Sequence, residues 1–216
     1  MKKYLMLIAA LSFMAFSCTK PDDQTGEGTT PGGEENTEGG TETPAPEYKA
    51  GDYYKAGLAE GIIAWLDETG EHGLLISLDE TVTQWSPEYH MIVVQGGELS
   101  HSDGHYNTKY IKTLEDWKNL YPAFAWCDAK NALGLSSWFL PAIDELEKAY
   151  LALDAINATL NEMELTPIST GPNDAYWTSV EYGVQGAYAF SFAEGEIASY
   201  GTNKKDENFV RAMRKF

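Results

Sequence analysis

The side chains that could bind a metal ion are few, and their spacing does not favour a metal site. His101, Asp103 and His105 offer two imidazoles and a carboxylate, ligands that zinc prefers, but no strong further ligand stands near them. Asn173 and Asp174 could offer oxygens to calcium, which needs about six to eight, but the glycine and proline before them favour a turn. We therefore expect no metal ion and no cofactor.

The carboxylates and the internal cysteine give no stronger case for catalysis. The pairs Asp79–Glu80 and Asp144–Glu145 point in different directions on a strand or a helix, so we expect them to be solvated. Cys127 lies in an apolar-rich segment with no histidine near it in sequence, which is typical of a buried and unreactive thiol. The sequence therefore predicts a protein that is not an enzyme.

Cys18 has the clearest chemical role in the chain. It ends an N-terminal segment in which two early lysines precede an apolar stretch from Leu5 to Met14, the pattern of a secretory signal peptide. The run Ala15–Cys18 resembles a bacterial lipoprotein box, although such boxes usually have leucine in place of Ala15. We therefore expect a signal peptide over residues 1–18 and lipidation of Cys18. The alternative is a plain signal peptide with a chance cysteine.

Residues 19–48 separate this signal from the rest of the chain. They are rich in Gly, Thr, Glu and Pro and nearly lack large apolar side chains, so they cannot bury enough surface to offset the entropy of ordering. We expect a disordered acidic spacer with a reach on the order of 30 Å. Asp22 and Asp23 resemble an export signal for the outer face of the outer membrane, although this composition equally suits a plain linker. The predicted location is the cell surface, with membrane contact through the lipid alone.

The negative charge of the chain lies mainly after this spacer. The formal net charge is −18, and residues 50–216 contribute −14 of it, with 11 Lys and Arg against 25 Asp and Glu. Such a surface repels phosphate backbones, so we expect no nucleic-acid partner. It also disfavours sulfated polysaccharides unless the positive charges cluster. Simple solubility of an exported protein is the more ordinary explanation of the acidity.

The elements that must position any site lie in residues 49–216, which are enough for one domain with a core. Two β-rich runs within Gly61–Leu78 flank the turn Asp67–Gly70 and predict a hairpin. Residues 91–94 predict a further short strand, and the polar run 96–107 predicts a loop.

Two helices are expected next, followed by strands. Pro122 and Gly134 suit the first position and the C-terminal cap of one helix, and helical spacing of apolar residues predicts another from near Pro141 to Leu160. In the last third, aromatic and small residues alternate in a strand pattern around Phe190. Shorter runs predict strands over residues 197–200 and 209–216. Strands, two helices and strands in that order indicate an α+β fold with antiparallel strands.

Three short motifs are similar to those of a known family. Ser136–Leu146 contains W-x-L-P-x-x-x-E-L, Tyr176–Tyr182 resembles Y-W-S-S-T-E-Y, and Phe209–Arg214 resembles a closing V-R-x-V-R. With the Gly61–Leu78 hairpin, they resemble the Legionella-collagen-like C-terminal domain family over about residues 51–216. The resemblance implies a C-type-lectin-like fold that serves as a binding or adhesion module without catalytic machinery.

The resemblance implies structural roles for the motif residues rather than chemical ones. Trp138 and Pro141 are expected to fix the join between two helices, and Trp177 to pack in the core. The better-known members of the family bind sulfated host glycans, but the strong acidity of this chain gives no support for that ligand.

The C-terminal region is the expected ligand face, by analogy with lectin-like folds. Sugars are commonly held by aromatic faces and by hydrogen-bonding side chains, and this region offers both. The candidate residues are Tyr182, Gln185, Tyr188, Glu196, Ser199, Tyr200 and Asn203. The alternative is that these aromatics are ordinary half-buried strand residues. We therefore expect a surface lipoprotein that binds a glycan or a protein, with a structural component of a pilus or envelope complex as the alternative.

Overall fold

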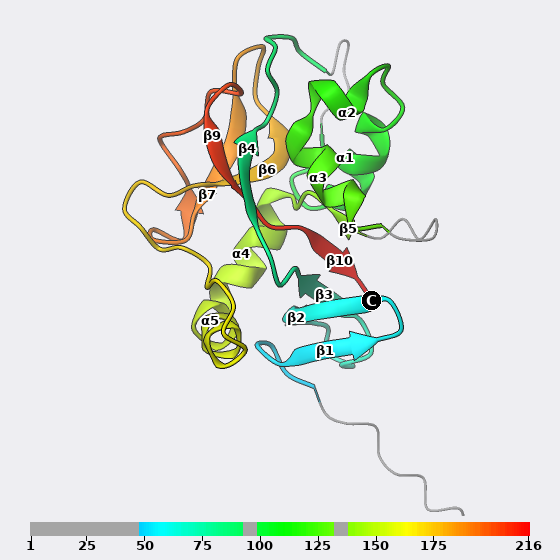
Figure 1. Cartoon of the computed structure of the whole chain (residues 1–216), viewed down its shortest axis with the longest axis vertical. Coiled ribbons are helices and arrows are strands. Elements are labelled where there is room, and N and C mark those ends of the chain that lie inside the picture. Colours follow the sequence, from blue (N-terminus) through cyan, green and yellow to red (C-terminus); the bar gives the residue numbers. More distant parts are fainter. Residues whose placement is uncertain (1–47, 93–98, 132–137) are drawn as a thin grey trace, which may run out of the picture. The chain divides into compact units, whose positions relative to one another are not determined.

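A computed structural model describes residues 48–92, 99–131 and 138–216 of the chain (Figure 1). Three predicted features lie outside these residues: Cys18, the acidic spacer except for residue 48, and the helix end at Gly134. The strand expected over residues 91–94 is half outside them, and its first two residues form no strand. Among the residues described, none of the helices combines the length and apolar character that a membrane span requires.

The first sheet, sheet A, combines strands from both ends of the described chain. Its order is β1 (Tyr53–Ala56), β2 (Ala59–Leu66), β3 (Gly73–Ile76), β10 (Met213–Lys215) and β5 (Trp138–Phe139), and all neighbours are antiparallel. Strands β2 and β3 confirm the predicted hairpin. Its turn contains Gly70 at φ 72°, a left-handed conformation that glycine adopts without strain.

The second sheet, sheet B, and the segments that connect its strands carry the predicted ligand residues. Its order is β4 (Thr81–Gln84), β9 (Glu207–Val210), β6 (Tyr176–Glu181), β7 (Ala187–Ser191) and β8 (Glu196–Ile197). The β9–β6 pair is parallel and the other pairs are antiparallel. Strand β7 confirms the alternation around Phe190, and β8 is shorter than predicted. The expected final strand is instead two strands, because the chain leaves sheet B after β9 and enters sheet A as β10.

The described residues form five helices, whereas the sequence predicted two. They are α1 (Gly104–Ile111), α2 (Trp117–Leu120), α3 (Pro122–Ala129), α4 (Ile143–Leu151) and α5 (Leu153–Glu162). The prediction of a loop through residue 107 was wrong, because Asp103 caps α1 by accepting a hydrogen bond from the Tyr106 amide. The predicted long helix from Pro141 is divided at Ala152, whose φ and ψ of −109° and 10° depart from helical values. The α+β class is confirmed.

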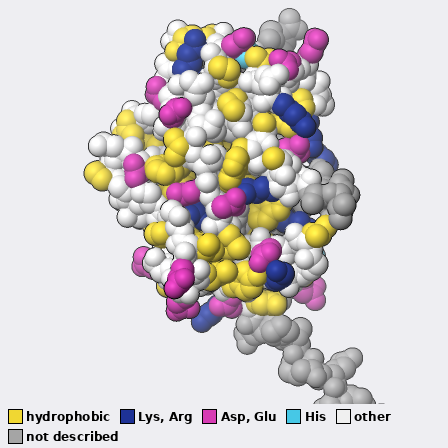
Figure 2. Space-filling model, in the orientation of Figure 1, with side chains coloured by type: hydrophobic (Ala, Val, Ile, Leu, Met, Phe, Trp, Pro, Cys, Tyr) yellow, Lys and Arg dark blue, Asp and Glu magenta, His cyan; other side chains and the backbone are white. Residues whose placement is uncertain are grey.

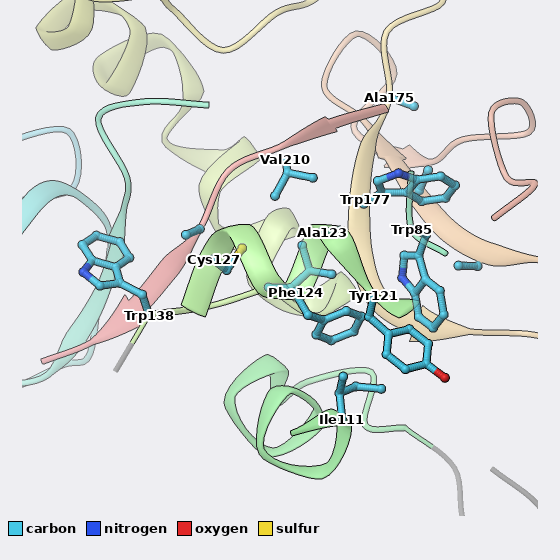
Figure 3. Close-up of a cluster of buried hydrophobic side chains, with 14 of the residues drawn as sticks. Trp85, Ile111, Tyr121, Ala123, Phe124, Cys127, Trp138, Ala175, Trp177 and Val210 are labelled. Atoms are coloured by element: carbon cyan, nitrogen blue, oxygen red, sulfur yellow. The ribbon is translucent and has the colours of Figure 1, made fainter. Parts of the chain in front are cut away.

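The central strands are buried on both faces, because one group of helices packs on each side. Ile63 and Leu75 belong to a first core with side chains of α1 and α3, whereas their neighbours Ile62 and Ile76 belong to a second core with α4 and α5. Figure 3 shows the first core, in which Trp85, Tyr121 and Phe124 meet edge to face, with ring centroids 5.4–6.2 Å apart. Trp177 also lies in this core, as predicted, and Trp138 enters it from strand β5.

The passage from one sheet to the other is held by Arg211, which is fully buried in the fold. Its Nε donates to Glu80 Oε2 at 2.7 Å, its Nη1 to the Ser77 carbonyl at 2.9 Å and its Nη2 to the Thr166 carbonyl at 2.5 Å. Ser77 also accepts at Oγ from the Ala212 amide at 3.0 Å. Arg211 therefore joins the segment in which the chain passes from β9 to β10 to the segment in which it passes from β3 to β4. The prediction that Glu80 is solvated was wrong, because its side chain is only 11% exposed.

Candidate functional site

The seven predicted ligand residues lie on two opposite faces of sheet B. Alternate residues of β7 define these faces: Tyr188 and Phe190 point to one side, and Ala189 and Ser191 to the other. The predicted residues divide between the two sides, so they do not form one continuous surface.

The first group contains Tyr182 and Tyr188. Their ring centroids are 4.9 Å apart, and the Tyr182 side chain is 49% exposed. Tyr188 is half-buried against a small apolar cluster beside α4, and the ring of His101 packs against it at 5.6 Å. Tyr182 Oη donates to Thr202 Oγ1 at 2.9 Å, and a Cβ on Gly186 would overlap the Tyr182 ring. The pair is therefore a fixed, partly exposed aromatic platform.

The second group contains Tyr200 and Glu196. Tyr200 Oη donates to Ser191 Oγ at 3.1 Å, and the ring packs against the first core. Glu196 pairs with Ser191 across β7 and β8, so its exposed side chain lies on this same side. Ser199 is exposed in the turn that follows β8. These three residues are therefore separated from Tyr182 and Tyr188 by the sheet.

Asn203 connects the first group to a residue that sequence analysis missed. Its Oδ1 accepts from Tyr89 Oη at 3.0 Å and from the Lys205 amide at 3.0 Å. Asn203 also bridges to Gly186 in the loop below Tyr182. Tyr89 is 41% exposed, and Lys205 Nζ lies 4.1 Å from the centroid of its ring. A tyrosine in a polar segment after Pro87 was the only signal that could have identified it.

These contacts define a group of residues near one end of sheet B, which we name the distal surface. It consists of Tyr89, Tyr182, Val184, Gln185, Tyr188 and Asn203. The hydroxyl groups of Tyr89 and Tyr182 bond to neighbouring residues, which restrains the rings without burying them. Such a surface offers apolar ring faces and amide groups, the combination that binds a sugar or a peptide.

A buried ion pair lies beneath the distal surface. Lys204 Nζ donates to Glu181 Oε2 at 2.6 Å and to the His90 carbonyl at 2.8 Å, and it lies 4.8 Å from the Trp85 ring centroid. Glu181 Oε1 accepts from the Ile92 amide at 2.8 Å. Burial lowers the pKa of Lys204, and Glu181 opposes that shift. The pair joins the segments before β9, after β6 and after β4, and so fixes the loops that carry the aromatic rings.

The candidate metal ligands have other contacts in the structure. Asp103 caps α1 and pairs with Lys215 Nζ at 2.9 Å, whereas the His101 and His105 rings pack against Tyr188 and Phe139. Across the described parts of the chain, no group of three or more His, Cys, Asp or Glu side chains could hold a metal ion.

The thiol of Cys127 is buried in the first core, and burial raises its pKa, which keeps it protonated. This agrees with the expectation of an unreactive side chain. Figure 2 shows Asp and Glu side chains scattered among Lys and Arg over the visible face, so the acidity forms no single patch there.

The fold is similar to that of a solved fimbrial protein from Bacteroides ovatus. The TM-score is 0.60 at 17% sequence identity, and the match covers 78% of this chain. It covers 49% of the fimbrial protein, so this chain corresponds to about half of that protein's length. No family model and no curated protein matches the chain. The likeness establishes a shared fold.

Proposed function

We propose that the protein is a surface-anchored, pilus-related lipoprotein that binds a ligand through its distal surface and catalyses no reaction. The fold similarity to a fimbrial protein is the observation that supports this most strongly. The signal sequence ending at Cys18 supports export and lipid anchoring, and the spacer that follows gives the domain its reach from the membrane. The C-type-lectin-like assignment remains a prediction from the three motifs.

The distal surface supports a glycan or a protein as the ligand. Tyr182 and Tyr89 present exposed ring faces while their hydroxyls are held by Thr202 and Asn203. Rings that are already fixed lose little conformational freedom on binding, which favours stacking against a sugar or an apolar side chain.

A structural role within a pilus is the second candidate. It is favoured by the name of the structural neighbour, a fimbrial protein, rather than by a feature of the distal surface. In that case, the distal surface contacts another subunit instead of a host or environmental ligand. Stable co-purification with a second envelope protein distinguishes this role from glycan binding.

The anchoring is tested in the bacterium that encodes the chain, with cells expressing the full-length protein or its Cys18→Ser variant. We expect radiolabelled palmitate to enter the full-length protein and not the variant. We also expect protease added to intact cells to degrade the anchored protein. Full protection from protease would contradict display at the surface.

The ligand role is tested by applying the full chain, purified in detergent, to a glycan array and by affinity capture from cells. Tyr182→Ala and Tyr89→Ala should each remove most of the binding. Tyr53→Ala is the matched control, because Tyr53 is also exposed and hydrogen-bonded but lies on β1 in sheet A. Equal loss in all three variants would refute a specific role for the distal surface.

A further inference from the structure

A concave site lies away from the distal surface, between sheet A and helix α4. It is a pocket of about 390 Å³, within the range of small-ligand sites. Its walls come from three elements: the β2–β3 hairpin, the end of β10 and the first turns of α4. Ser102, just before α1, completes the rim. We name it the α4 pocket.

Positive side chains converge on the α4 pocket although the domain is strongly acidic. Lys148 and Lys215 both line it. In the part of the chain that the structure describes, no carboxylate lies within ion-pair distance of Lys148 Nζ, which rests 4.1 Å from the Trp65 ring centroid. Lys215 pairs with Asp103, and both side chains are partly exposed. Among residues 50–216, with 25 acids and 11 bases, such a cluster is uncommon.

A buried carboxyl group forms part of the same wall. Glu145 is 2% exposed, and its Oε2 accepts from the Ala142 amide at 2.8 Å and the Gly104 amide at 3.0 Å. Its Oε1 is buried and has no hydrogen-bond partner in the structure. Burial raises the pKa of Glu145 to about 7, so part of the population is uncharged at neutral pH and repels an anion weakly.

Trp65 and Leu74 supply an apolar wall opposite these polar groups. An apolar wall with a few convergent polar side chains is the usual composition of a site for a small organic molecule. The lysines favour a ligand that carries a negative charge, and the volume suits a ring of monosaccharide size.

We propose that the α4 pocket binds a carboxylate-bearing sugar, with Lys148 and Lys215 holding the carboxylate and the sugar ring lying against Trp65 and Leu74. The pocket is independent of the distal surface and of the proposed adhesion function. Lysine recognises a carboxylate as a point charge, and a hydrogen bond between charged partners exceeds a neutral one in strength.

The test is an NMR titration of the full chain in detergent with galacturonate and, separately, with galactose. These probes differ mainly in the carboxylate. We expect the indole resonance of Trp65 to shift with galacturonate, and galactose to bind at least about tenfold more weakly. Equal binding of the two sugars, or no Trp65 shift with galacturonate, would overturn the proposal.

Substitutions of the pocket lysines test whether galacturonate binds in the α4 pocket. Lys148→Gln and Lys215→Gln should each weaken galacturonate about tenfold. Lys205→Gln is the matched control, since Lys205 is an exposed lysine beside Tyr89 on the distal surface. Unchanged binding in both pocket lysine variants would refute the site.

Each variant is compared with the parent by thermal melting, so that loss of the fold is separated from loss of the contact. If one lysine variant fails to fold, the other still decides the proposal. The adhesion function is measured on Tyr182→Ala, which leaves the α4 pocket unaltered, so either proposal can fail without the other.

Discussion

Sheet B has a buried ion pair at each of its ends, and the two pairs connect different parts of the chain. Arg211 and Glu80 lie where β9 ends and β4 begins, whereas Lys204 and Glu181 lie before β9 and at the end of β6. The planar Arg211 guanidinium donates to one carboxylate and two carbonyls, which joins two crossings between the sheets. Lys204 is a point charge that joins loops.

The difference separates an ion pair that completes a core from one that fixes exposed loops. At the Arg211 end, the tyrosine of β6 is buried: Tyr176 Oη accepts from the Ser169 amide and donates to Glu80. At the Lys204 end, Tyr182 remains half exposed, although its hydroxyl is equally bonded. An ion pair that completes a core leaves no surface for a ligand, whereas one placed beneath loops restrains them and keeps their rings accessible.

The largest expected effect is at Arg211. Arg211→Met leaves Glu80 and two carbonyls without their donor, so we expect the free energy of unfolding to fall by about 3–5 kcal/mol. Urea denaturation measures it. Lys55→Met breaks the exposed Lys55–Glu60 pair and serves as the control, with little change expected. Similar stabilities for the two variants would contradict the claim that the Arg211–Glu80 pair stabilises the core.

Glu145 can be compared with Glu80 and Glu181, because it is also a buried carboxyl group but is bonded to backbone amides rather than to a cation. Its pKa of about 7 lies above the unfolded value near 4.5, so its stabilising effect is complete below about pH 4.5 and is lost as the pH rises through 7. We expect a loss on the order of 3 kcal/mol over that window. Urea denaturation at a series of pH values measures it. A Glu145→Gln variant with the same pH slope would contradict this assignment.

Lys204 should have a smaller effect on stability and a local effect on the loops. We expect Lys204→Met to cost about 2 kcal/mol, because Glu181 keeps the Ile92 amide as a donor. Hydrogen exchange at that amide should accelerate in this variant and not in Arg211→Met at equal global stability. Equal exchange rates at the Ile92 amide in the two variants would contradict a local effect of Lys204 on the loops.

The smallest expected change in stability comes from removing the hydroxyl groups of two tyrosines at opposite ends of β6. Tyr176→Phe should cost about 1 kcal/mol, since its buried hydroxyl bonds to Ser169 and Glu80. Tyr182→Phe should change stability by less than about 0.5 kcal/mol, because water can replace the Thr202 contact. Thermal melting of both variants measures the difference. A larger loss of stability in Tyr182→Phe than in Tyr176→Phe would contradict this prediction.

Patterns that depend on neighbouring residues were predictable from the sequence. The hairpin at Gly61–Leu78, the helix start at Pro122 and the strand around Phe190 were all correct, because turn residues and alternation report local structure directly. Helix α1 was missed because it turns polar residues inward. Asn107 is buried and bonds to the Ser100 carbonyl and Ser179 Oγ, so no apolar stripe marks the helix.

Features that depend on distant contacts could not be predicted. The division of the last strand at Arg211 is invisible in a continuous run of strand-forming residues, because it depends on Glu80 and Ser77 at the other crossing. The same holds for the candidate site. Tyr89 joins the distal surface through Asn203, 114 residues away in sequence, and Tyr200 leaves it because its partner is Ser191.

The segment from β9 to β10 also makes both sheets depend on contacts between distant parts of the chain. It supplies an inner strand to each sheet, β9 between β4 and β6, and β10 between β3 and β5. Arg211 and Ser77, which join the crossings, are 134 residues apart, so an early hairpin such as β2–β3 must wait for a distant partner. Pairing across such separations slows folding.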